Sequence, residues 1–226
     1  MSYLFFDTET TGLPKNFGAP VTDTENWHPT VQIAWAPVSL TERTIGTPRS
    51  YIILPNGLEI PSKATAIHGI STERARREGH RLGKVLDRFL KAVATSHGLV
   101  AHNVAFDVPT VRAELVRLKR PDPLVSIATI CTKEESTDYC QLPSTSRWHS
   151  GYKWPSLQEL HETLFDQGFE NAHDASSDVE AGARCFLELV NRGIIDPDPE
   201  SQNGTESRTG FPGESPSNTR TDTLPF

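Results

Sequence analysis

The apolar residues of this chain recur in two periods, one typical of strands and the other of helices. Residues 3–8 form a short β-prone run that is apolar on both faces, as expected of a central strand between two layers of helices. Residues 82–95 carry apolar positions three and four apart, which indicates an amphipathic helix. The whole pattern predicts strands over 3–8, 31–38, 50–54, 98–101 and 125–130, and helices over 71–78, 82–95, 106–118, 156–164 and 175–191.

Two polar segments, residues 12–29 and 132–153, separate these elements and are predicted to be loops. Long loops beside a central strand often carry function. From Asp196 onward the sequence is polar, acidic and without periodicity, so it cannot bury enough surface to offset the entropy lost on ordering. We therefore expect one α/β domain over residues 1–195 and a disordered acidic tail over 196–226.

Charge and cysteine content narrow the classes of function. The 226 residues carry a formal net charge of -7, which argues against nucleic-acid binding through a global basic field and leaves a local site open. Three cysteines without a CxxC pair indicate neither a disulfide framework nor a structural zinc site. No apolar stretch approaches the ~18 residues of a membrane span, and no signal peptide is evident, so we expect a soluble, cytoplasmic protein.

Two carboxylates, Asp7 and Glu9, end the predicted central strand. Residues two apart in a strand point to the same side, so both side chains leave one face together. Ligands of open α/β sheets usually bind beyond the carboxyl ends of the strands. The competing interpretation is a solvated acidic turn, because Asp and Thr also end strands that carry no chemistry.

Two further segments place acidic residues where helices begin. HNVAFD follows the short strand at 98–101, so Asp107 is expected near the sheet edge that holds the first two carboxylates, or as a helix-capping residue. HDASSD opens the last helix, where five residues turn the helix by about 140°, so His173 and Asp178 converge only if His173 stays in the preceding loop. Asp174 or Ser177 serves as the cap.

Taken together, FFDTETTG, HNVAFD and HDASSD resemble the three exonuclease motifs of the DnaQ-like, DEDD-type 3′–5′ exonucleases. The histidine at position 173 resembles that of the histidine-containing branch. The resemblance extends to AIHGI at 66–70 and WPSLQEL at 154–160, and it covers about residues 3–192. It implies a ribonuclease H-like mixed sheet flanked by helices. The loops at 13–30 and 132–153 depart from the family pattern.

The resemblance also implies a metal-dependent mechanism. Four carboxylates within about 5 Å repel by roughly 3 kcal/mol per pair at an effective dielectric constant of 20, which calls for cations. Oxygen ligands favour Mg²⁺ or Mn²⁺, two of which can activate water and stabilise the leaving oxygen. By resemblance, Asp7, Glu9 and Asp178 hold the first cation, and Asp7 helps hold the second together with Asp107. His173 takes the proton from the attacking water.

Substrate contacts are implied by the same family. A set of residues near the motifs is expected to cradle the terminal nucleotide: Thr10, Thr11, Leu13, Ile67, His68, Asn103 and Phe106. Phe106 is interpreted either as a platform for a base or as a core aromatic at a helix start. The densest basic stretch either follows a phosphate backbone or forms a solvated helix face, and it contains Arg74, Arg76, Arg77, Arg81, Lys84 and Arg88.

The chain ends in an apolar triplet, Leu224, Pro225 and Phe226, after a polar acidic segment. This ending resembles the peptide that binds bacterial sliding clamps, although the initial Gln is absent. It also resembles the acidic tip of single-strand-binding proteins, although the run of aspartates is absent. A terminus without a binding role is the third interpretation.

The sequence therefore predicts a 3′–5′ exonuclease that releases 5′-mononucleotides from DNA 3′ ends, single-stranded or frayed, as a proofreading or repair accessory. An exoribonuclease that trims RNA is the alternative enzyme, since the same five residues serve both polymers. An inactive adaptor that presents its C-terminal peptide to a replication partner is the alternative from another class.

Overall fold

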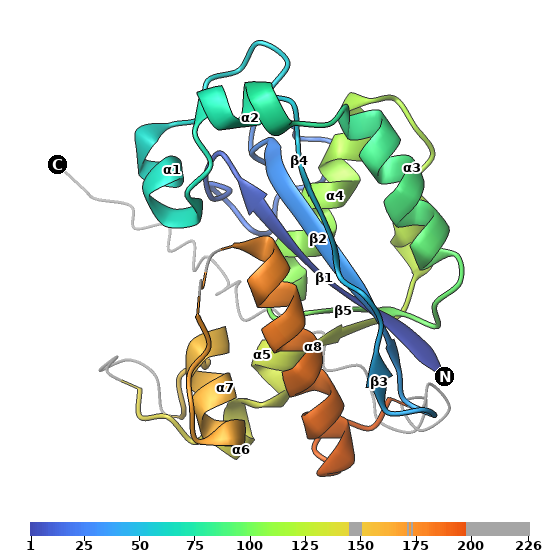
Figure 1. Cartoon of the computed structure of the whole chain (residues 1–226), viewed down its shortest axis with the longest axis vertical. Helices are drawn as coiled ribbons and strands as arrows, with labels where there is room; N and C mark the ends of the chain where they lie inside the picture. The colour runs from blue at the N-terminus through green and yellow to red at the C-terminus, as the bar shows by residue number, and fades with distance from the viewer. Residues whose placement is uncertain (145–150, 171, 173, 198–226) are drawn as a thin grey trace, which may run out of the picture.

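The computed structural model describes residues 1–144, 151–170, 172 and 174–197. In these residues the strands are β1 (Ser2–Thr10), β2 (Thr30–Ser39), β3 (Thr44–Ile45), β4 (Arg49–Ile52), β5 (Leu99–Ala101) and β6 (Thr129–Cys131). They form one sheet in the order β3-β2-β1-β5-β6, with β4 also paired to β2 (Figure 1). β1 runs antiparallel to β2 and parallel to β5. The predicted central position of the first strand is thus confirmed.

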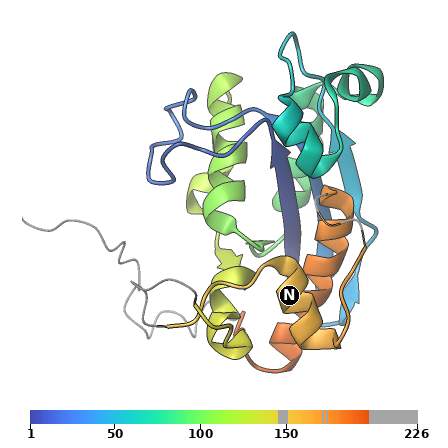
Figure 2. The same cartoon turned by 90° about the vertical axis from the view of Figure 1, so that its left-hand side faces the viewer.

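Helices cover both faces of this sheet, as the sequence predicts. They are α1 (Ser62–His68), α2 (Thr72–Glu78), α3 (Leu82–Val93), α4 (Val104–Arg117), α5 (Thr132–Glu135), α6 (Thr137–Cys140), α7 (Leu157–Phe165) and α8 (Ala175–Asn191). Figure 2 shows the sheet between α4 on one side and α8 on the other. The mixed sheet flanked by helices confirms the expected ribonuclease H-like class of fold.

The strict alternation of β1 assigns its side chains to two separate cores. Tyr3 and Phe5 belong to the buried cluster formed with α7 and α8. Leu4 and Phe6 belong to the cluster formed with α3 and α4 on the other face. Burying side chains of this size stabilises the fold by about 1.5–3 kcal/mol each. The same alternation decides where the polar residues that follow along β1 point.

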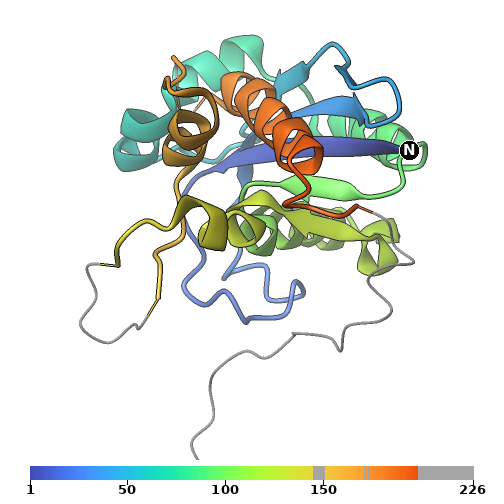
Figure 3. The same cartoon turned by 90° about the horizontal axis from the view of Figure 1, so that it is seen from below.

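The segment between β1 and β2 is anchored to α4. Arg117 donates through Nη2 to the carbonyl oxygens of Thr24, at 2.7 Å, and of Trp27. Glu114 accepts from the backbone N–H of Thr30 at 2.7 Å and pairs with Arg117 at 3.1 Å. Figure 3 shows this loop on the side of the sheet away from α8. Residues 12–29 contain neither helix nor strand, which confirms the predicted loop.

The structure differs from the sequence prediction in one predicted strand and in several short elements that are not predicted. The strand expected over 125–130 is wrong in its first half, because Pro123–Ser126 form a 3-10 helix in which the Asp122 side chain accepts from the Leu124 N–H. Helix α1 was not predicted, since Pro61 precedes it without a side-chain cap and only Ala64 and His68 are buried. α5 and α6 lie within the predicted loop 132–153, whose residues 145–150 are outside the described part.

Candidate metal and catalytic site

Three carboxylates converge beside the end of β1. Asp7, Glu9 and Asp178 each offer an oxygen, and these atoms all lie within 4.8 Å of one another. Phe5 faces α8, so Asp7 and Glu9, which continue the same row of β1, face α8 as well. The predicted shared direction of the two strand carboxylates is confirmed. β5 pairs with β1 only at Leu4 and Phe5, which leaves this end of the strand open toward β5.

Helix α8 brings the third carboxylate to the cluster. The Asp174 side chain caps the helix by accepting from the Ser177 N–H, so Asp174 is the cap that the sequence left open between two candidates. Asp178 then lies in the first turn. Gly182, one turn later, allows α8 to approach β1, because a Cβ at this position would lie 2.2 Å from Phe5 Cζ. The position of Asp178 therefore depends on a glycine that the sequence analysis did not identify.

Asp107 reaches the site from the opposite face of the sheet. Its Oδ1 accepts two hydrogen bonds from Thr8, one from the backbone N–H at 3.0 Å and one from the hydroxyl at 2.7 Å. Thr8 lies between Asp7 and Glu9 and points the other way, toward α4. Asp107 is buried at 2% exposure and lies next to the three-carboxylate cluster rather than within it. This placement agrees with the prediction that Asp107 lies at the same sheet edge.

Burial and mutual repulsion raise the pKa values of these acids. Loss of solvation, together with the charges of Asp107 and Asp178, raises the pKa of Asp7 well above its usual value. The same causes raise the pKa of Glu9 to about 8. Burial raises the pKa of Asp107 to about 7, against the Thr8 hydrogen bonds and the attraction of Lys133. A partly buried set of carboxylates that repel one another fits a hard divalent cation, whose charge offsets the lost solvation and the mutual repulsion.

The residues expected to contact substrate lie around this cluster. Thr10 is buried and donates through Oγ1 to the Gly12 carbonyl oxygen at 2.6 Å. Leu13 and Ile67 expose 69% and 60% of their surface. Phe106 is half-buried, with the Phe17 ring centroid 6.5 Å away. The geometry thus leaves the two interpretations of Phe106 open and adds Phe17 as a residue that the sequence analysis missed.

Two further candidates are tied into the fold. Thr11 Oγ1 lies 3.3 Å from His28 Nδ1. His68 is buried, which lowers its pKa, and its Nδ1 accepts from the Ile70 N–H at 3.2 Å. Asn103 is the N-terminal cap residue of α4, and its Oδ1 accepts a hydrogen bond from Lys133 Nζ at 2.6 Å. Lys133 was not identified from the sequence because it lies in a segment predicted to be a loop.

Several predicted residues cannot be placed. His173, as well as Leu224, Pro225 and Phe226, lies outside the residues that the structure describes. In the basic stretch, Arg74 pairs with Glu78 at 3.0 Å, and Arg77 pairs with the same carboxylate. These contacts favour the interpretation of this stretch as a solvated helix face.

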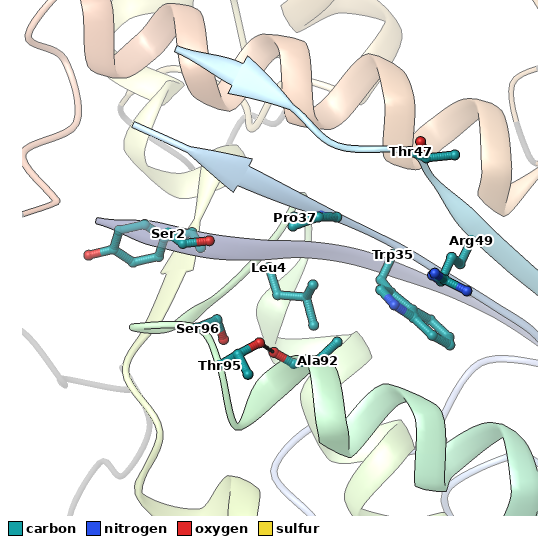
Figure 4. A pocket seen from close by; sticks show the side chains of 10 residues that line it. Ser2, Leu4, Trp35, Pro37, Thr47, Arg49, Ala92, Thr95 and Ser96 are labelled. Carbon is teal, nitrogen blue, oxygen red and sulfur yellow. Dashed lines mark hydrogen bonds between the residues drawn. The ribbon is translucent and has the colours of Figure 1, made fainter. Parts of the chain in front are cut away.

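A pocket of about 320 Å³ lies at the opposite end of β1. Figure 4 shows that β1, β2, the start of β4 and the end of α3 form its walls, with Leu4, Trp35 and Arg49 among its side chains. It contains none of the carboxylates described above.

No helix within the described residues is both long and apolar enough to cross a membrane.

A mixed sheet with helices on both faces and an acidic cluster beside its central strand is typical of the ribonuclease H-like class of fold. Residues 4–186 match the family model RNase_T, described as Exonuclease, and the chain belongs to this family. The expected relation to the DnaQ-like 3′–5′ exonucleases is thereby confirmed. No curated protein sequence matches the chain.

Solved structures share the fold. E. coli Exonuclease I in complex with a dT13 oligonucleotide matches with a TM-score of 0.64 and 20% identity, over 90% of this chain and 43% of that one. The nuclease domain of 3′hExo, a DEDDh family member bound to rAMP, matches with a TM-score of 0.65 and 12% identity, over 85% and 93%. Exonuclease X in complex with 5′ overhanging duplex DNA matches with a TM-score of 0.56 and 22% identity, over 86% of this chain and 94% of that one. The chain thus spans less than half of the Exonuclease I chain.

Proposed function

We propose that this protein is a metal-dependent 3′–5′ exonuclease. The observation that carries the proposal is the convergence of Asp7, Glu9 and Asp178 within 4.8 Å, with buried Asp107 beside them. Asp7, Glu9 and Asp178 would hold one Mg²⁺ or Mn²⁺, and Asp7 with Asp107, partly through water, would hold a second. When bound, such a pair supplies activation of the attacking water and stabilisation of the leaving oxygen.

The side chains of the chain perform the remaining steps. His173 takes a proton from the water whose oxygen attacks the last phosphodiester. The bond from phosphorus to the 3′ oxygen breaks, this oxygen gains a proton, and the terminal nucleotide leaves as its 5′-monophosphate. Thr8 acts as a positioning residue, because its two hydrogen bonds hold the Asp107 carboxylate at the open edge of β1.

We propose DNA 3′ ends, single-stranded or frayed, as the substrate, and proofreading or repair as the role. The bound DNA in the structures of Exonuclease I and Exonuclease X supports this choice. RNA trimming is the second candidate, and the likeness to the 3′hExo nuclease domain bound to rAMP favours it. Both proposals use the same five catalytic residues.

The test is cleavage of matched 5′-labelled DNA and RNA oligonucleotides with Mg²⁺, with Mn²⁺ and with chelator. We expect a ladder that shortens from the 3′ end, requires metal and disappears in Asp7→Asn, Asp178→Asn and His173→Ala. Asp138→Asn, which makes the same change at an exposed position on α6, is the matched control and should retain full activity. Full cleavage by Asp7→Asn, or none by the parent protein on either polymer, contradicts the proposal.

We also propose that residues 196–226 tether the domain 1–195 to a replication partner through Leu224, Pro225 and Phe226. A sliding clamp or a single-strand-binding protein is the partner to test, in binding assays with and without residues 224–226. Their deletion should weaken partner binding and leave cleavage of short oligonucleotides unchanged. Strong partner binding by a protein that cleaves neither polymer would favour the inactive adaptor instead.

A further inference from the structure

Lys133 and Trp154 form a pair beside the acidic cluster, although 20 residues separate them in the chain. The Lys133 ammonium lies 4.6 Å from the centroid of the Trp154 ring and 2.6 Å from Asn103 Oδ1. Asn103 begins α4, and its carbonyl oxygen accepts from the Asp107 N–H at 3.2 Å. The pair is therefore connected through one residue to the helix turn that carries Asp107.

The pair is held in place by His102. Its Nδ1 lies 3.1 Å from Thr132 Oγ1, and its Nε2 lies 3.0 Å from the Pro155 carbonyl oxygen. Thr132 precedes Lys133 and Pro155 follows Trp154, so one half-buried imidazole bridges the two chain segments. This arrangement brings the segments that carry the ammonium and the indole together without a ligand.

Among the described residues, Lys133 forms no close ion pair, and its charge acts on the Asp107 carboxylate only from a longer distance. Its close contacts are an amide oxygen and an aromatic face. The neighbouring Lys153, by contrast, is paired with Glu159. An ammonium has three donors, and Asn103 occupies one. Two donors therefore stay available for an anion. A phosphate oxygen fits this position because it accepts a charge-assisted hydrogen bond.

Trp154 has an unusual degree of exposure for a tryptophan, with 62% of its surface accessible. Trp27 and Trp35, in contrast, expose 1% and 2%. Every base presents a flat π face, so an exposed indole provides a stacking platform that tolerates any sequence. An anion site next to an aromatic platform matches the phosphate and the base of one nucleotide.

We propose that Lys133 and Trp154 bind a nucleotide of the substrate strand near its 3′ end, Lys133 through a phosphate oxygen and Trp154 by stacking on the base. This inference rests on the proposed exonuclease function and specifies how a single strand is held beside the cluster. The contact strengthens substrate binding and takes no part in the chemical step.

The experiment measures the Kd of a 5′-fluorescein oligothymidylate by anisotropy in chelator, together with KM and kcat in Mg²⁺ or Mn²⁺. Trp154→Ala should raise Kd and KM by about ten-fold, the size of typical stacking losses, with kcat unchanged. Lys133→Met should raise Kd and KM as well, and the comparison of kcat uses Trp154→Ala because the Lys133 charge also acts on Asp107. Lys133→Met should also reduce the slope of log Kd against log salt by about 0.7, the change expected for one phosphate contact to a single strand. Trp154→Phe and Lys133→Arg keep the ring and the charge and should stay near the parent protein.

Lys91→Met, at an exposed position on α3, is the matched control for the loss of a lysine and should change none of these constants. Unchanged Kd and KM in both Trp154→Ala and Lys133→Met, in a protein that still cleaves, overturn this inference and leave the exonuclease function standing. A fall in kcat alone in Trp154→Ala overturns it as well, because it shows a role in the chemical step. A parent protein that cleaves neither polymer contradicts the proposed function itself.

Discussion

Replacing Gly182 by alanine tests whether the approach of α8 to β1 positions the acidic cluster. The added Cβ would lie 2.2 Å from Phe5 Cζ and 2.4 Å from Phe5 Cε1. Carbon atoms pack best at about 3.5–4.0 Å, so α8 and the ring have to separate by roughly 1.3 Å or more. Phe5 is 1% exposed and has little room to move away. The helix is therefore expected to shift, and Asp178 shifts with it.

The cost to stability and the cost to activity should differ. Overpacking lowers the free energy of unfolding by about 1–3 kcal/mol, whereas the higher helix propensity of alanine raises it by about 1 kcal/mol. We therefore expect a net destabilisation of ~0–2 kcal/mol. A displacement of about 1 Å at a catalytic group can cost about 10²-fold in rate. Gly182→Ala should thus lower kcat/KM by about 10–100-fold and weaken binding of divalent metal, while the fold is retained.

The assays are urea unfolding, metal titration followed by thermal stability, and cleavage kinetics. Gly83→Ala on α3 is the matched control, because the nearest atom to its Cβ would be Arg120 Nη1 at 4.0 Å, so it should be neutral or stabilising. Phe5→Leu in the Gly182→Ala background should recover part of the metal affinity, and the double-mutant cycle measures this coupling. Metal affinity and kcat/KM equal to those of the parent protein in Gly182→Ala would refute the reasoning.

Three further predictions follow from the same contacts. The pKa values of Glu9 and Asp107 are raised to about 8 and about 7, so in chelator these two groups bind more protons in the folded protein than in the unfolded chain. The Tm in chelator should therefore fall as pH rises from about 5 to 8, and Mg²⁺ or Mn²⁺ should restore it. Ser156→Ala removes the capping box of α7 and should cost about 1 kcal/mol in urea unfolding. Glu114→Ala leaves Arg117 without its carboxylate and the Thr30 N–H without its acceptor, and should cost about 3 kcal/mol, whereas Glu114→Gln should cost less. A Tm independent of pH in chelator would show that the acids are solvated.

The parts of the site that the sequence predicts depend on local periodicity. Asp7 and Glu9 share a face because β1 is extended and they are two residues apart, so their shared direction can be predicted from this short segment alone. Asp178 lies in the first turn of α8 because Asp174 caps the helix, which the residue types also indicate. In both cases the direction of the carboxylate depends on residues within one helical turn or within two positions of a strand.

The missed parts depend on contacts between distant segments. Lys133 lies near Asn103 only because α5 follows β6 and β6 pairs with β5. The requirement for glycine at position 182 arises only because α8 packs against Phe5, which is far away in the chain. The strand predicted over 125–130 fails for a related reason, since Val125 is apolar yet 68% exposed beside a proline-initiated turn. A pattern in one segment cannot indicate which other segment packs against it.

The alternation of β1 explains how one strand assembles acids from both faces of the sheet. Asp7 and Glu9 point toward α8 and meet Asp178, while Thr8 between them points toward α4 and binds Asp107. A one-residue shift of β1 relative to β2 would reverse every one of these directions. Tyr3 and Phe5 on one face and Leu4 and Phe6 on the other resist such a shift, because it would exchange the two cores. The apolar half of β1 thus fixes the register that its acidic half requires.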